Sequence, residues 1–263
     1  MSSTSISAKQ VFLVGAGPGD SRLITLRGKE LLEQADVIIH DELANRALLE
    51  WAKPGAEIVY VGKRAGHHYA QQTEINRILV AHARTGRTVV RLKGGDPLVF
   101  GRGGEEANAL REAGIGFEIV PGVTAAVGVA ATTEIPLTHR GVSSAVLFIT
   151  GHECAEKSGT GIDWDAVARV KCTMVVYMGL KAARTIVGRL RLAGAEADLP
   201  VALVSRATLP DQQVLVATLA SFEQELLARE VPSPALLVIG EVVRQNPAAA
   251  AALAAMAPMA AEQ

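Results

Sequence analysis

Short apolar runs alternate with amphipathic segments along the first half of the chain. Within 73–84, for example, Ile75, Ile78 and Leu79 recur at helical spacing. Continuous apolar strands that alternate with helices are typical of a parallel sheet covered on both faces. The predicted strands are 11–14, 37–39, 57–61, 88–92 and 117–120, and the predicted helices are 23–34, 73–84, 105–113 and 123–131.

The rhythm breaks at 134–144, which is our candidate for a domain link. Further strands are predicted at 145–150, 173–178, 201–205, 213–218 and 235–239, with helices at 181–193 and 219–229. The short link before 213–218 is typical of a hairpin, which makes the second sheet mixed. We predict two α/β domains, an N-terminal one with a mainly parallel sheet (1–136) and a C-terminal one with a mixed sheet (137–246). An Ala-rich tail (247–263) follows, interpreted as a frayed helix or a disordered extension.

Composition narrows the class of partner. The 263 residues carry 26 Lys and Arg against 27 Asp and Glu, so no global basic field exists for nucleic acid or an anionic membrane. The uncharged stretch 119–133 is too short, and too broken by Pro121 and two glycines, to span a bilayer. A polar start without a signal core and two sparse cysteines indicate a cytoplasmic protein with reduced thiols.

Glycine-rich loops follow most of the predicted strands, at the edge where parallel sheets bind ligands. Gly15–Asp20 is similar to the dinucleotide fingerprint, but Asp20 replaces its last glycine and Pro18 removes an amide donor. Because a phosphate cradle needs free amides, this loop suits pyrophosphate poorly. An ordinary tight turn is the alternative interpretation.

Charged residues stand at three other strand ends. Asp41 follows the second strand, either as a working carboxylate or as a helix N-cap. Lys63 and Arg64 lie between glycines, which suits anion binding or a solvated turn. After the fourth strand, Gly94 and Gly95 permit a ligand to lie against bare backbone, and Asp96 offers an acceptor for a hydroxyl pair or an amino group.

The loop 100–106 leads into a predicted helix. Glu105 and Glu106 are favourable at the N-terminus of a helix, but this does not explain Arg102, which lies between glycines. Small residues at 121–125 again permit close approach. Together these loops favour one nucleoside-like ligand laid across several strand ends without a phosphate cradle. The chain has no Gly-x-Ser-x-Gly elbow, Walker loop or His-Glu-x-x-His motif, and the adjacent His67 and His68 are interpreted as surface residues. No metal site is predicted.

These motifs, in this order, resemble the tetrapyrrole methylase family, most closely its members that methylate uroporphyrinogen III at carbon. The resemblance runs from about Val11 to Arg244. The motifs are Gly15–Asp20, His40–Leu43, Gly62-Lys63, Lys93–Pro97, Phe100–Glu106, Pro121–Ala125 and Thr138–Gly141.

The resemblance implies a fold of two α/β domains with S-adenosyl-L-methionine in the cleft between them, and a homodimer. It implies two successive methyl transfers, to C2 and C7 of uroporphyrinogen III, giving precorrin-2 by way of precorrin-1. Precorrin-2 feeds sirohaem, cobalamin and haem d1. Some relatives carry a dehydrogenase–chelatase module in front, which we do not expect ahead of Gly15 here.

The resemblance also assigns roles. Asp41 corresponds to a proton acceptor and Lys63 to a proton donor, although the residues alone leave Asp41 and Glu105 both open as the base. Arg102, Glu105 and Arg140 correspond to residues that bind the substrate or handle protons. The positions implied to bind the cofactor are Gly15, Gly17, Pro18, Gly94, Gly95, Asp96, Val99, Thr124, Ala125, Met178 and Ala207.

Other functions stay open at this point. Within the family they are a later precorrin methyltransferase, a diphthine synthase and a ribose 2′-O-methylase of ribosomal RNA, which should show a broader basic face. A nicotinamide-dependent oxidoreductase is disfavoured by Pro18 and Asp20, and a non-catalytic nucleoside-binding regulator is a further alternative. Because uroporphyrinogen carries eight carboxylates, we expect Arg64, Arg102 and Arg140 to form a positive cleft on a protein of balanced charge.

Overall fold

A computed structural model describes residues 11–62, 72–151 and 162–256. By contacts the chain divides into two units, Met1–Ala125 and Ala126–Gln263, and each is described by itself. This division precedes the segment 134–144 in which the sequence suggests a link. Within the described residues, no helix combines the length and the apolar character that crossing a bilayer requires.

The first unit contains a five-stranded parallel sheet in the order β3-β2-β4-β1-β5. This confirms the mainly parallel N-terminal sheet. The order places β4 and β1 side by side in the centre, so the loops that follow them meet at one edge. The strands are β1 (Val11–Gly15), β2 (Val37–His40), β3 (Glu57–Tyr60), β4 (Val89–Lys93) and β5 (Phe117–Val120).

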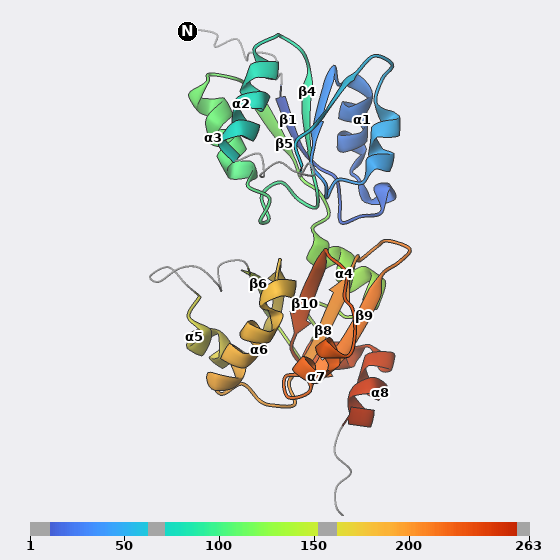
Figure 1. Cartoon of the computed structure of the whole chain (residues 1–263), viewed down its shortest axis with the longest axis vertical. Helices are drawn as coiled ribbons and strands as arrows, with labels where there is room; N and C mark the ends of the chain where they lie inside the picture. The colour runs from blue at the N-terminus through green and yellow to red at the C-terminus, as the bar shows by residue number, and fades with distance from the viewer. Residues whose placement is uncertain (1–10, 63–71, 152–161, 257–263) are drawn as a thin grey trace, which may run out of the picture. The chain divides into compact units, whose positions relative to one another are not determined.

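Helices cover both faces of this sheet (Figure 1). Alternation along β1 directs Phe12 and Val14 toward α1 and η2, while Val11 and Leu13 pack with α2 and α3. Thr25 begins α1 by accepting a hydrogen bond from the Gly28 amide, 3.1 Å away. The helical elements are η1 (Ser21–Leu23), α1 (Leu26–Gln34), η2 (Arg46–Trp51), α2 (Gln72–Ala83) and α3 (Gly103–Glu112).

The second unit contains a five-stranded sheet in the order β6-β7-β10-β8-β9. Its β6 and β7 are parallel, whereas β10 is antiparallel to both β7 and β8, and β8 and β9 form an antiparallel hairpin. The predicted mixed sheet is therefore confirmed. The strands are β6 (Val146–Thr150), β7 (Thr173–Tyr177), β8 (Pro200–Ser205), β9 (Gln213–Thr218) and β10 (Ala235–Ile239).

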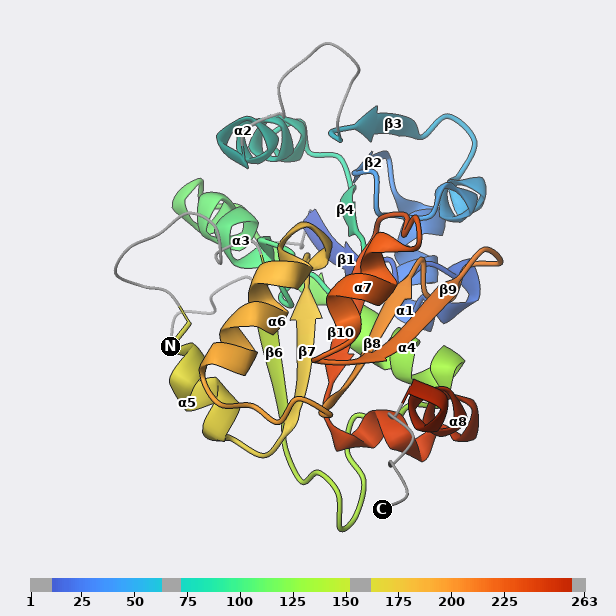
Figure 2. The same cartoon turned by 60° about the horizontal axis from the view of Figure 1, so that its bottom comes forward.

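In the second unit α5, α6 and α7 pack on one face of the sheet (Figure 2). On the opposite face the Ala126 amide of α4 donates to the Tyr177 hydroxyl at 3.1 Å, which ties α4 to β7. The helical elements are α4 (Ala125–Thr133), α5 (Trp164–Arg169), η4 (Leu180–Ala182), α6 (Ala183–Leu192), α7 (Phe222–Leu227) and η5 (Glu241–Gln245).

Residues 247–256 form α8 (Pro247–Met256), so this part of the Ala-rich segment is a helix and not a disordered extension. Asn246 fixes its start, because its side chain accepts from the Ala249 amide at 2.7 Å and donates to the Thr133 carbonyl at 3.1 Å. Ala249 and Leu253 are buried. The sequence interpretation missed this cap and the buried side, because an Ala-rich segment has almost no hydrophobic periodicity.

Candidate functional site

The loops after β1 and β4 are joined backbone to backbone. The Ala16 amide donates to the Lys93 carbonyl at 2.7 Å. Gly17 and Gly95 exchange amide-to-carbonyl hydrogen bonds of 3.2 and 2.7 Å. The amides of Ala16 and Gly17 are thus already committed inside the fold, which supports the expectation that this loop is no phosphate cradle.

Several of the loop glycines are required by this packing. A Cβ on Gly15 would lie 2.6 Å from the Gly122 Cα, and a Cβ on Gly94 would lie 2.6 Å from the Leu43 Cβ. A Cβ on Gly122 would meet the Gly95 carbonyl oxygen. Such contacts are closer than atoms tolerate, so these glycines allow loop to approach loop rather than ligand to approach loop.

Gly95 is different. Its φ of +66° lies in the left-handed region, and an added Cβ would have no neighbour closer than the Ala125 nitrogen at 3.9 Å. The next atom is the Thr124 Cα at 4.0 Å. Gly95 therefore presents bare backbone to free space beside Thr124 and Ala125, and all three residues are predicted from the sequence to bind the cofactor.

Asp96 links the loops that follow β4 and β5. Its Oδ2 accepts from the Gly122 amide at 3.0 Å, and its Oδ1 accepts from the Leu98 amide at 2.8 Å. The carboxylate is half-buried and has a direct role in loop structure, besides the ligand role expected from sequence. Pro18 and Val99 are also half-buried at this edge.

A buried ionic cluster lies beneath the same edge. Glu106 of α3 is fully buried, and its Oε1 accepts from Arg91 Nε at 3.0 Å and from Lys93 Nζ at 3.1 Å. Gln72 Nε2 reaches the same oxygen at 3.4 Å. The other oxygen, Oε2, is buried and has no hydrogen-bond partner among the described residues. Burial, then the charge of Arg91, lower the pKa of Lys93.

Asp41 is attached to this cluster. Its Oδ2 accepts from Arg91 Nη2 at 2.9 Å, and its Oδ1 accepts from the Leu43 amide at 3.2 Å. The Asp41 side chain keeps 26% of its surface exposed, against 3% for Arg91. A carboxylate anchored from the buried side and open on the other is suited to accept a proton from a bound molecule.

Arg102 and Glu105 form an exposed pair at the start of α3. Two parallel bonds of 2.8 Å join the guanidinium to the carboxylate. This hydrogen bonding lowers the pKa of Glu105. Arg102 has a φ of 58°, and Phe100 before it has 52°, so this loop holds two strained side-chain-bearing positions.

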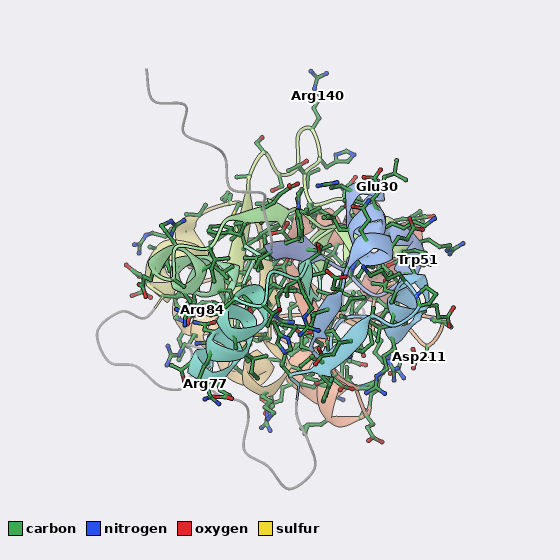
Figure 3. All side chains as sticks on the ribbon, turned by 90° about the horizontal axis from the view of Figure 1, so that it is seen from above. Glu30, Trp51, Arg77, Arg84, Arg140 and Asp211 are labelled. Atoms are coloured by element: carbon green, nitrogen blue, oxygen red, sulfur yellow. The ribbon has the colours of Figure 1, made fainter. Side chains whose placement is uncertain are left out.

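The second unit holds the remaining predicted positions. Met178 directly follows β7 and has a φ of 53°, and Ala207, just after β8, stands between Arg206 (52°) and Thr208 (68°). Because β7 and β8 both run antiparallel to β10, they end at the same edge of the sheet. Local strain of this kind is common at ligand sites. Arg140 extends from its loop into solvent (Figure 3).

Several residues considered in the sequence analysis lie outside the described residues: Lys63, Arg64, His67, His68 and one of the two cysteines, Cys154. Among those described, no group of three or more His, Cys, Asp or Glu side chains is arranged to hold a metal ion. Cys172 is a buried free thiol whose pKa is raised by burial.

Sequence reasoning missed Arg91 and Glu106. The available signal was Arg91 itself, a charge inside the otherwise apolar run 89–92, because a strand covered on both faces buries a cation only when it is paired. No comparable signal marked Glu106, which shares its helix start with the exposed Glu105.

Comparisons with known proteins agree with this architecture. The family model for Tetrapyrrole (Corrin/Porphyrin) Methylases matches residues 10–223. A siroheme synthase of Zymomonas mobilis is 52% identical over 233 residues, which are 89% of this chain and 49% of that protein. The chain thus spans about half the length of such curated relatives.

Solved structures give a similar result over nearly their whole length. A uroporphyrin-III C-methyltransferase from Thermus thermophilus, complexed with S-adenosyl homocysteine, is 42% identical and has a TM-score of 0.76, covering 90% of this chain and 99% of its own. A cobalt precorrin-4 methyltransferase has the same TM-score at 29% identity, covering 88% of this chain and 95% of its own. The two solved structures thus have equal TM-scores and differ in their sequence identity to this chain.

Proposed function

Because this chain belongs to the tetrapyrrole (corrin/porphyrin) methylases, we propose that it transfers methyl groups from S-adenosyl-L-methionine to carbons of uroporphyrinogen III. The products would be precorrin-1 and then precorrin-2, through methylation at C2 and C7. The observation that carries the proposal is the loop edge of the first unit, where Asp41 is anchored from below beside the glycine loops.

The residues present fit the cofactor. S-adenosyl-L-methionine is a nucleoside without a polyphosphate, and the amides of Ala16 and Gly17 are bonded inside the fold rather than open to a phosphate. The free space at Gly95 beside Thr124 and Ala125 suits a ligand held against bare backbone. The remaining residues proposed to hold it are Gly15, Gly17, Pro18, Gly94, Asp96, Val99, Met178 and Ala207, with Gly15 and Gly94 serving through loop packing.

When bound, this cofactor supplies an already activated methyl group, so the protein must orient the acceptor and manage a proton. A pyrrole carbon that gains a methyl group must have a proton removed from its ring system before a neutral product forms. We assign this proton to Asp41, whose carboxylate is fixed by Arg91 and the Leu43 amide and is open on its other side. We propose Lys63 as the proton donor.

Glu105 is the weaker candidate for the base. The Arg102 fork occupies both of its oxygens, whereas Asp41 gives only one oxygen to Arg91. We therefore propose that Arg102 and Glu105 act together on the acidic substrate. A substrate carboxylate would compete with Glu105 for the guanidinium fork, and the exposed Arg140 would offer a second cation.

The proposal is tested by anaerobic incubation of the purified chain with S-adenosyl-L-methionine and uroporphyrinogen III. Mass spectrometry should show one and then two added methyl groups, and the oxidised products should absorb as chlorin-like pigments. S-adenosyl homocysteine should inhibit the reaction. An acceptor that gains no methyl group while the protein still binds S-adenosyl homocysteine would exclude uroporphyrinogen III as the substrate.

A later precorrin methyltransferase is the second candidate, supported by the equal TM-score of the cobalt precorrin-4 enzyme. The same assay with a later precorrin distinguishes the two candidates, because only one acceptor should be methylated efficiently.

We also propose that the protein is cytoplasmic and forms a homodimer. Light scattering of the purified chain tests the homodimer. A monomeric mass at micromolar concentration would contradict the dimer.

A further inference from the structure

We propose that Arg91, held by Glu106, which also pairs with Lys93, is a positioning residue that fixes the Asp41 carboxylate for proton transfer. This inference rests on the proposed function, in which Asp41 accepts a proton during methyl transfer. It concerns residues that the sequence motifs left without a role. Arg91 lies in the middle of the sheet with 2% of its surface exposed, where a cation is costly unless it is fully paired.

The hydrogen bonds of Arg91 leave its side chain a single orientation. Nε donates to Glu106, Nη1 donates to the Leu92 carbonyl at 2.9 Å and to the Ile39 carbonyl at 3.4 Å, and Nη2 donates to Asp41. The strand register explains this reach, because Arg91 pairs with Ile39, two residues before Asp41 on the same face. Arg91 therefore transmits the rigidity of the central strands to a carboxylate at the loop edge.

Glu106 completes the arrangement by holding both cations of β4 through one oxygen. The cluster contains two cationic side chains, Arg91 and Lys93, and two acidic ones, Glu106 and Asp41, all from elements packed against one another. Removing one member would unbalance the charges of the cluster. A purely structural cluster would need no link to the exposed edge, whereas here Asp41 alone is partly exposed.

The test is a double-mutant cycle of Asp41→Asn and Arg91→Lys, which keeps the cation but removes the guanidinium fork. We expect Arg91→Lys to lower kcat about 10- to 100-fold with little change in KM or in affinity for S-adenosyl homocysteine. In the Asp41→Asn background it should have no further effect on kcat. Equal losses in both backgrounds, or an unchanged kcat, would overturn the proposal.

Two further variants protect the test. Glu106→Gln preserves the shape of the cluster and weakens the hold on Arg91 from the other side. It replaces Arg91→Lys in the cycle if that variant fails to fold, and its effect on kcat should likewise disappear in the Asp41→Asn background. Arg77→Lys is the matched control, because Arg77 is exposed on α2 and paired only with Glu74 among the described residues. It should leave kcat and KM unchanged.

A crystal structure of Arg91→Lys separates this proposal from the proposed function. We expect the Asp41 carboxylate to turn away from its present position. If it keeps the same orientation, the positioning role is wrong whatever the enzyme methylates. If it turns but wild-type protein methylates no uroporphyrinogen III, the substrate proposal fails, and the cycle is run with the precorrin that does accept methyl groups.

Discussion

Arg91 Nη2 and Asp41 Oδ2 lie 2.9 Å apart, although 50 positions separate the two residues in the chain. The pair connects the centre of the first sheet to the edge at which the glycine loops meet. Arg91 holds one oxygen of Asp41 from the buried side, while the nearby Leu43 amide holds the other.

Asp41→Asn should lower kcat by about 10²- to 10⁴-fold, because the amide cannot accept the proton that the reaction releases. Binding of S-adenosyl homocysteine, measured by calorimetry, should stay within twofold of wild type. If Asp41→Asn keeps the wild-type kcat at saturating substrate, Asp41 is not the base.

Arg102→Ala should weaken the apparent affinity for the acidic substrate by about 10- to 100-fold, the effect of losing one charge-assisted carboxylate contact. Stability should change by less than about 1 kcal/mol, because the pair with Glu105 is exposed. Steady-state KM and thermal unfolding measure the two effects. Arg77→Ala serves as the control, and an unchanged KM for Arg102→Ala would remove the proposed carboxylate contact.

Gly122→Ala and Gly104→Ala should have very different effects on the free energy of unfolding. The added methyl group at Gly122 meets backbone of the neighbouring loops, and we expect a loss of about 1–3 kcal/mol. At Gly104 no atom lies within 4 Å, and the residue is helical, so the change should range from nothing to a gain of about 1 kcal/mol. Urea unfolding measures both, and equal stabilities of the two variants would contradict the packing argument.

Asp36→Asn should alter the acid sensitivity of the first unit. The hydrogen bond from Lys53, then that from the Thr88 amide, lower the pKa of Asp36 below 3.8 in the folded protein. The carboxylate therefore stabilises the fold above that pH and loses this effect as pH falls through the lower folded value.

We expect Asp36→Asn to cost about 1 kcal/mol at neutral pH, a modest figure because both side chains are partly exposed to solvent. The difference from wild type should shrink at about pH 2.5. Denaturant unfolding at both pH values measures it, and a difference that grows in acid would have the wrong sign.

Much of the fold was readable from local pattern. The strand at 117–120 matches β5 and the strand at 213–218 matches β9, because each is an apolar run bounded by turn residues. The second half was harder, since α5 and α8 are short or poor in periodicity and are stabilised by packing and by caps such as Asn246.

The site was only partly readable. Glycines and charges at strand ends identified the edge, since parallel strands bring those ends together. The reason for several glycines was not readable. At Gly15 and Gly122 the neighbour that excludes a Cβ is another loop, and that contact exists only in the folded chain.

The sequence by itself determined the alternation of strands and helices, the loops that carry chemistry and the absence of a global basic charge, because each depends on residues close together in the chain. The tertiary structure decided which charges meet. The register of β2 against β4 brings Arg91 beside Ile39 and hence to Asp41, and the start of α3 brings Glu106 to Arg91 and Lys93. Pairings across strands follow from sheet order and helix packing, which no local pattern specifies.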